Sequence, residues 1–139
     1  MLRYLVLIPL LWLNTSMADV TRTQTEILTQ RCLDTFDFIE KKDIETFIAQ
    51  MPVTPSDFER KRAEKVLKRA HERWFIKEKI ISIEPGRVTF SEPSKVKQEK
   101  YQAQEQAKIG LLIIGENYRS TMSCKFIKTP KGWFLSSLP

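Results

Sequence analysis

The chain has 139 residues, of which 42% are hydrophobic, and a formal net charge of +6 at pH 7. This length suits one domain with one hydrophobic core. With only four glycines and no repeat or low-complexity tract, the composition excludes a collagen-like chain and a disordered one. The basic excess raises the question of an anionic partner, which depends on where the basic residues lie.

The N-terminal segment has the pattern of a secretory signal peptide. Arg3 precedes an apolar run from Tyr4 to Leu13, and small residues stand at Ser16 and Ala18. This order of basic, apolar and small residues predicts cleavage before Asp19 and therefore export. A transmembrane anchor would need a longer apolar run, of roughly 18 residues or more. Since no cysteine stands near the cleavage site, we expect a periplasmic or secreted protein without a lipid anchor.

Two helices are expected directly after this segment. The first, residues 23–41, carries an apolar stripe at helical spacing that consists of Leu28, Cys32, Thr35, Phe36 and Ile39. Asp34 and Asp37 lie off this stripe, toward water. Asp43 is the expected N-cap of a short second helix, because its carboxylate can accept a hydrogen bond from a free backbone N–H near Thr46. Pro52 ends that helix.

A third helix, residues 55–77, is expected after the segment PVTPSD. Thr54 would cap it, with Pro55 at its first position. Its apolar arc consists of Ala63, Val66, Leu67, Ala70 and Trp74. A basic surface on the opposite side consists of Lys61, Lys65, Lys68, Arg69 and Arg73.

This basic surface has two interpretations. It is either a solvated helix face or a site of weak contact with anionic lipid or polysaccharide. A nucleic-acid partner is not expected, because an exported protein does not meet chromosomal DNA and the stretch lacks the interleaved aromatic residues of such modules. Membrane insertion is also disfavoured, since the apolar arc is small.

Strands follow in the second half of the chain. KIISIEPGRVTFSE predicts two strands around a turn at Pro85-Gly86, and the polar stretch SKVKQEKYQAQEQ is either a loop or the frayed start of a strand. AKIGLLII predicts a buried strand, residues 118–126 alternate in strand fashion, and TPKG turns the chain into a last strand, WFLSSL. We therefore expect residues 1–18 to be a signal peptide. Residues 19–139 should form a single α+β domain, with three N-terminal helices packed on a curved antiparallel sheet of four to five strands.

The two cysteines, Cys32 and Cys124, both follow the predicted cleavage site. In an oxidising compartment an even pair favours a disulfide, and the alternative is two buried thiols that act as small hydrophobes. His71 is the only histidine, and neither cysteine has a second one at ligand spacing. No metal and no cofactor are therefore expected.

The order of these elements resembles the nuclear-transport-factor-like superfamily, the cystatin-like, cone-shaped domains that include ketosteroid isomerase-like enzymes and many small secreted bacterial proteins. The features that carry the resemblance are CLDTFDFIEKKDIETFI, the third helix ending in HERWF, and the closing hairpin CKFIKTPKGWFLSSLP. The strand that the family usually places between the second and third helices is missing here or reduced to PVTP. The resemblance implies a cone whose interior can hold a ligand.

Enzymes of this family place a carboxylate, a histidine or a tyrosine inside the cone, and the inward stripe of the first helix offers no acid and no histidine. His71 lacks an identifiable carboxylate partner for acid–base work. The candidate residues for a ligand pocket are Tyr118, Glu116, Phe36 and Trp74. The alternative is structural, with Tyr118 and Trp74 as core aromatics and Glu116 as a loop charge.

The expected function is a non-catalytic binding or interaction module, because the implied fold offers a pocket and the sequence offers no catalytic set. Its partner would be a small apolar ligand or another protein, a second copy of the chain included. The alternative is an isomerase or dehydratase-like enzyme that uses the cone interior.

Overall fold

The computed structural model describes residues 17–77 and 79–139, and of residues 17–22 only the backbone. The helices are α1 (Met17–Lys41), α2 (Ile44–Ala49), α3 (Asp57–His71), its π-helical continuation η1 (Glu72–Lys77), and α4 (Lys95–Tyr101). The strands are β1 (Ile80–Ser91), β2 (Glu105–Gly115), β3 (Arg119–Thr129) and β4 (Gly132–Ser137). The predicted signal peptide lies outside the described residues except for its last two, which begin α1.

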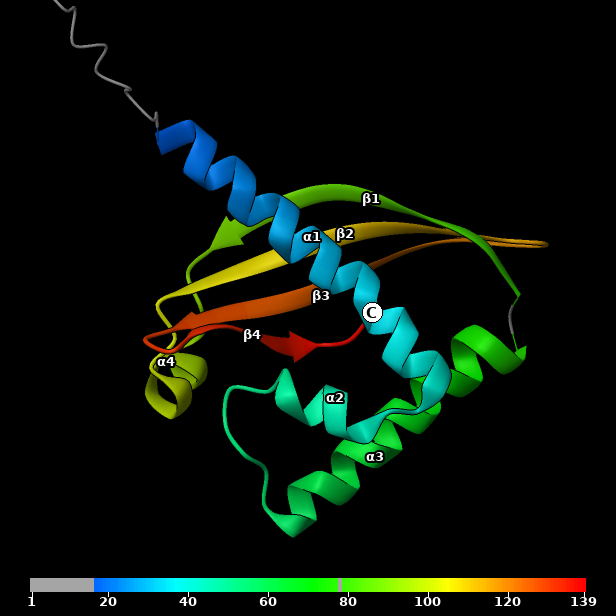
Figure 1. Cartoon of the computed structure of the whole chain (residues 1–139), viewed down its shortest axis with the longest axis horizontal. Coiled ribbons are helices and arrows are strands. Elements are labelled where there is room, and N and C mark those ends of the chain that lie inside the picture. The colour runs from blue at the N-terminus through cyan, green and yellow to red at the C-terminus, as the bar shows by residue number, and fades with distance from the viewer. Residues whose placement is uncertain (1–16, 78) are drawn as a thin grey trace, which may run out of the picture.

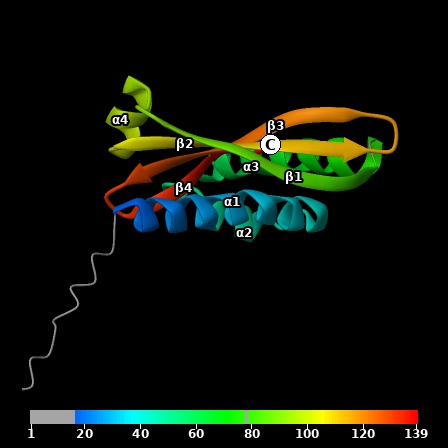
Figure 2. The ribbon, with the colours of Figure 1, turned by 90° about the horizontal axis from the view of Figure 1, so that it is seen from above.

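The four strands form one antiparallel sheet in the order β1-β2-β3-β4. Helix α1 crosses one face of this sheet, and α4 lies at the other side of one end (Figures 1 and 2). The predicted α+β fold, helices followed by a four-stranded antiparallel sheet, is therefore confirmed. Within the described residues, no helix combines the length and the apolar character needed to cross a membrane.

The core forms where α1 meets the sheet. All five residues of the predicted stripe on α1 are buried, and the neighbouring Asp34 and Asp37 are exposed, as expected. The Thr35 hydroxyl donates a hydrogen bond of 2.7 Å to the Cys32 carbonyl, so this polar residue is satisfied inside the helix. From the sheet, alternate residues of β2 point into the same core because strand side chains have a period of two; they are Ala107, Ile109, Leu111 and Ile113.

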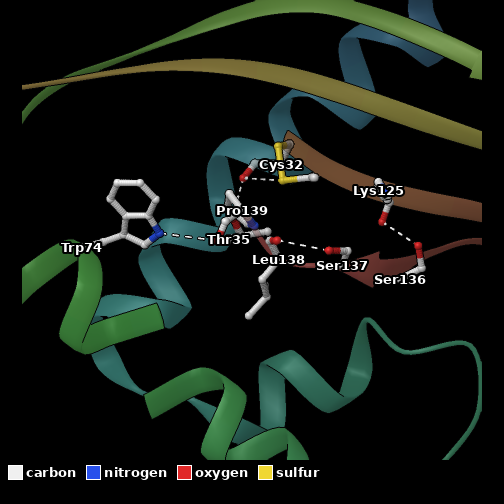
Figure 3. The surroundings of a disulfide bond; sticks show 9 residues. Cys32, Thr35, Trp74, Lys125, Ser136, Ser137, Leu138 and Pro139 are labelled. Carbon is white, nitrogen blue, oxygen red and sulfur yellow. Dashed lines mark hydrogen bonds between the residues drawn. A yellow bond between two sulfur atoms is a disulfide. The ribbon is translucent and has the colours of Figure 1, made fainter. Parts of the chain in front are cut away.

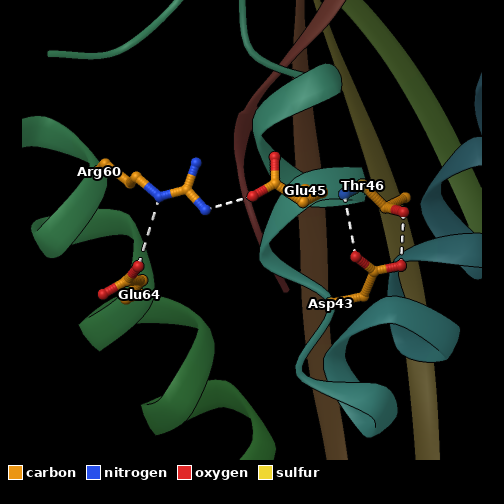
Figure 4. A network of polar contacts seen from close by, with 5 residues as sticks. All are labelled: Asp43, Glu45, Thr46, Arg60 and Glu64. Carbon is orange, nitrogen blue, oxygen red and sulfur yellow. Dashed lines mark hydrogen bonds and ion pairs between the residues drawn. The ribbon is translucent and has the colours of Figure 1, made fainter. Parts of the chain in front are cut away.

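Side-chain caps set the starts of α2 and α3. Asp43 caps α2, since its carboxylate accepts hydrogen bonds from the Thr46 backbone N–H at 3.2 Å and from the Thr46 hydroxyl (Figure 4). The expected cap of α3 was wrong: Ser56 is the N-cap, not Thr54. Ser56 and Glu59 form a reciprocal capping box, in which each side chain bonds the other's backbone N–H. This pair of hydrogen bonds explains why the helix begins after Ser56.

Two sequence predictions in the second half were wrong. KIISIEPGRVTFSE forms one strand, β1, with an irregularity between Pro85 and Val88 in place of a turn. An edge strand tolerates a proline at such a bulge, because no second neighbour needs its missing N–H. The polar stretch that follows contains α4, which Ser94 caps through the Lys97 backbone N–H at 3.4 Å and which ends at Gln102 in the left-handed region, φ 56°.

Candidate ligand-binding groove

A groove of about 790 Å³ lies among α3, α4, the connection between α2 and α3, and the end of β4. Its apolar walls include the buried residues Phe47, Ala63, Ala70 and Leu135. Ligand sites in proteins commonly measure about 300–1,000 Å³ and are mostly apolar. The groove therefore has the size and the lining of a small-molecule site.

Hydrogen bonds around Gln50 fix one side of the groove. The Leu135 backbone N–H donates to the Gln50 carbonyl at 2.7 Å, which fastens the end of α2 to β4. The Arg31 guanidinium donates to the Gln50 side-chain oxygen at 2.6 Å and to the Trp133 carbonyl at 2.9 Å. Partial burial lowers the pKa of Arg31 from its ordinary value. Arg31 thus joins α1, α2 and β4 and has a structural role.

Helices α2 and α3 are also joined by an ion-pair network at the surface (Figure 4). The Arg60 guanidinium contacts the Glu45 carboxylate of α2 and lies 3.5 Å from the Glu64 carboxylate, one helical turn along α3. The hydrogen bond to Glu45 raises the pKa of Arg60. Since these side chains are exposed, the network orients the two helices and adds little to stability.

Three exposed valines from separate segments gather around the groove. Val53 from the α2–α3 connection, Val66 from α3 and Val96 from α4 line it, with exposed fractions of 48%, 45% and 69%. Val66 is thus the one member of the predicted apolar arc of the third helix that is not buried. Leu67 and Ala70 occupy the face of α3 that packs on the core, and Val66 turns from it toward the groove.

Five cationic side chains also line the groove. Arg62, Arg69 and Arg73 come from one face of α3 and its continuation, because spacings of seven and eleven residues correspond to about two and three helical turns. Lys97 and Lys100 come from α4. The groove is thus apolar inside and positively charged along two helices.

The single carboxylate side chain on the groove wall belongs to Glu59. It is held by hydrogen bonds from the Ser56 backbone and hydroxyl, which lower the pKa of Glu59. The Lys100 ammonium lies 4.0 Å from this carboxylate and also over the Tyr101 ring, 5.2 Å from its centroid. Glu59 therefore stays ionised at neutral pH and neutralises part of the charge of Lys100.

Lys97 is the most enclosed of the groove lysines. Its ammonium donates to the Gln106 side-chain oxygen at 2.7 Å. Burial, followed by the nearby charge of Lys125, lowers the pKa of Lys97. The hydrogen-bond partner of Lys97 is thus a neutral amide. In the described part of the chain, no carboxylate balances the positive charge of Lys97.

The predicted basic surface lies only partly along the groove. Arg69 and Arg73 line the groove, whereas Lys61, Lys65 and Lys68 are exposed elsewhere on the helix. All five side chains are exposed, and two of them also line the groove. Lys65, Arg69 and Arg73 follow one another at four-residue spacing and are neighbours on the helix, but only the last two reach the groove.

The four predicted pocket residues lie away from the groove. Phe36 and Trp74 are 5% and 0% exposed and pack edge to face in the core, with ring centroids 6.1 Å apart. The Trp74 indole N–H points to the Pro139 carbonyl at 3.4 Å (Figure 3). Glu116 is exposed and pairs with Lys79 at 3.3 Å.

Tyr118, the remaining pocket candidate, closes the turn between β2 and β3. Its ring packs on Gly115, where an added Cβ would lie 1.9 Å from a ring carbon. The Gly115 backbone N–H also donates to the Tyr118 carbonyl at 2.9 Å. The turn therefore requires glycine at this position, and the structure gives Tyr118 a packing role.

His71 also lies outside the groove. Its Nδ1–H donates to the Ile39 carbonyl at 3.0 Å, and its ring stacks on Phe75 at 5.8 Å between centroids. The carbonyl can only accept, so the hydrogen bond fixes the proton on Nδ1. In the described residues, no three His, Cys, Asp or Glu side chains are arranged to hold a metal ion.

The two cysteines meet in the core between α1 and β3. Their Cα atoms lie 5.7 Å apart and their sulfur atoms 2.11 Å apart, which is disulfide distance (Figure 3). Cys32 belongs to the buried stripe of α1, and Cys124 faces it from the inner side of β3. The pairing joins the helical layer to the sheet, as the sequence suggested.

The sequence interpretation did not include Arg62, Lys97, Lys100 or the three valines in a site. One local signal was present: Pro93-Ser94 before SKVKQEKY is an N-cap pattern that predicts a helix start. The seven-residue spacing of Arg62 and Arg69 also places them on one helix face. Neither signal shows that α3 and α4 face the same groove.

No protein-family model and no curated protein sequence matches this chain. Among solved structures, a protein from Campylobacter jejuni described as an NTF2-like transpeptidase is similar, with a TM-score of 0.51 and 13% sequence identity. The similarity covers 73% of this chain and 90% of that one. At this identity it shows the fold alone. The chain therefore has the NTF2-like fold that its order of helices and strands indicated.

Proposed function

We propose that the protein is an exported, non-catalytic binding module that holds an apolar ligand in the groove beside α3. The observation that carries this proposal is the exposure of Val53, Val66 and Val96 on three separate segments around one cavity. Exposed apolar side chains that gather in one place mark binding sites, whereas scattered ones need no explanation. The apolar floor beneath these valines continues their surface into the groove.

The polar groups of the groove favour binding over catalysis. A general acid or base works best with a pKa near the operating pH, but the capping hydrogen bonds lower the pKa of Glu59. His71 does not line the groove, so the groove serines Ser136 and Ser137 lack a histidine base on its wall. The isomerase or dehydratase alternative has no comparable support. Transpeptidase activity likewise remains a property described for the C. jejuni protein.

Binding can be tested with a neutral apolar dye, N-phenyl-1-naphthylamine, whose fluorescence increases in apolar surroundings. We expect the folded protein to bind it. The double variant Val66→Gln/Val96→Gln should bind roughly tenfold more weakly or worse, because each valine would contribute about 1 kcal/mol when the dye covers its exposed surface. Ile27→Gln is the matched control, since Ile27 is 54% exposed on α1 and does not line the groove. Absence of binding to the unmodified protein would contradict the proposal.

Export is a separate expectation that rests on the N-terminal sequence. Protein expressed from the full-length chain in a bacterium should be recovered from the periplasm or the medium, with its N-terminus at Asp19 or within a residue or two. N-terminal sequencing or intact-mass measurement checks the cleavage site. Recovery of the uncleaved chain in the membrane fraction would show that this segment is an anchor.

A further inference from the structure

We infer that the ligand is an anionic amphiphile, an alkyl chain with a carboxylate head, whose chain packs on the groove valines and whose head pairs with Arg69. This inference rests on the proposed function and adds the chemical class of the ligand. Its basis is the imbalance between five cationic side chains and one carboxylate side chain around an apolar groove. An uncharged ligand would not neutralise the excess positive charge of the groove.

Four of the five cations already have partners. Arg73 lies over the Trp74 ring at 4.5 Å from the centroid, and Arg62 lies over Phe58 at 5.9 Å. Lys97 donates a hydrogen bond to the Gln106 side chain, and the Lys100 ammonium lies near the Glu59 carboxylate. The Arg69 guanidinium has no hydrogen bond, ion pair or ring contact in the described part of the chain. Arg69 is therefore the groove cation that is free to bind an anion.

The position of Arg69 suits an amphiphile. Val66 precedes it by three residues, so the two side chains are neighbours on one face of α3. Val96 and Lys97 bring the same combination of an apolar and a cationic side chain from α4. A guanidinium binds a carboxylate through two parallel hydrogen bonds. One molecule with an apolar chain and a carboxylate can thus contact both kinds of side chain at once.

The electrostatics of Lys97 supports the same conclusion. Its charged form is disfavoured by burial and by Lys125, with a neutral amide as its hydrogen-bond partner. A carboxylate in the groove would stabilise this charged form, because an opposite charge offsets both effects. Arg69 and Lys97 thus provide cationic side chains on the two helices that flank the groove.

An acidic peptide added as a strand beside β4 fits the structure less well. The Leu135 backbone N–H on the open edge of β4 is already bonded to the Gln50 carbonyl, so a peptide could not pair along the whole strand. The edge is also short, since β4 ends at Ser137. Strand addition draws its affinity from a continuous row of main-chain hydrogen bonds. The structure therefore favours an amphiphile over a peptide.

The test compares dodecanoate with 1-dodecanol, which share the alkyl chain and differ in charge. Each ligand is measured by its displacement of the naphthylamine dye from the protein. We expect dodecanoate to bind the unmodified protein at least about tenfold more tightly than dodecanol does, since a charged hydrogen-bonded pair replaces a neutral contact. Arg69→Gln should remove most of this preference and leave the affinity for dodecanol unchanged. Lys65→Gln, an exposed cation of α3 outside the groove, is the matched control and should retain the preference.

The outcomes separate the two proposals. Equal affinity for dodecanoate and dodecanol would overturn the anionic head while leaving the apolar groove in place. Failure of both ligands and of the dye would overturn the binding function itself. Binding of a peptide with alternating Glu and Leu, without binding of dodecanoate, would show that the groove receives a polypeptide. Unchanged circular dichroism of both charge variants ensures that a lost preference reflects the removed charge.

Discussion

Replacement of Cys32 and Cys124 together by alanine is expected to lower the free energy of unfolding by about 4–5 kcal/mol. The two residues are 92 positions apart in the sequence, and a bond between them restricts a long loop of the unfolded chain. Their Cα separation of 5.7 Å lies in the ordinary range for a disulfide. The loss is large compared with the total stability of a single domain, about 5–15 kcal/mol.

Urea denaturation of the unmodified protein, with and without a reducing agent, measures this effect. The reduced protein keeps both sulfur atoms, so it separates loss of the bond from the cavity that alanine leaves. Thiol titration of the denatured, unreduced protein should find no free cysteine. Two free thiols, or the same urea midpoint before and after reduction, would show that the cysteines only fill the core.

The features predicted correctly from the sequence are those that local pattern determines. The stripe on α1 depends on helical spacing alone, and the burial of β2 depends on a short run of apolar residues. Asp43 caps α2 because the carboxylate and the N–H that it accepts from are three residues apart. The pairing of Cys32 with Cys124 followed from two such patterns, since each cysteine lies on the inward face of its own element.

The errors occurred where local signals competed or were weak. Pro85-Gly86 carries a strong turn signal, but the segment lies on the edge of the sheet, where a bulge absorbs the proline without reversing the chain. Helix α4 has only seven residues, nearly all polar, so it lacks the periodic apolar face that marks longer helices. Its hydrogen bond to β2, from Lys97 to Gln106, is a tertiary contact that the local sequence does not show.

The groove could not be predicted because it belongs to no single segment. Val53, Val66, Val96 and Leu135 come from four parts of the chain that tertiary packing brings together. The sequence indicated a basic third helix, but its pattern did not show which of the basic side chains line a groove. Arg69 lines the groove and the neighbouring Lys65 does not, a difference that depends on where tertiary packing places α4 and the end of β4.

Trp74→Ala is expected to lower the free energy of unfolding by about 3–5 kcal/mol, because it removes a large, fully buried side chain. The change also removes the edge-to-face contact with Phe36 and the hydrogen bond to the Pro139 carbonyl. Trp74→Phe should cost less, since it keeps most of the apolar volume. Urea denaturation measures both variants, and Phe58→Ala is the control, within about 0.5 kcal/mol of the unmodified protein because Phe58 is 70% exposed.

The same variant decides between the two roles considered for Trp74. If the indole belongs to the core, the folded fraction of Trp74→Phe should bind the naphthylamine dye as the unmodified protein does, because Trp74 is not on the groove wall. A pocket residue would give the opposite pattern, with nearly unchanged stability and lost binding. That result would move the ligand site from the groove beside α3 into the interior between α1 and the sheet, where Phe36 also lies.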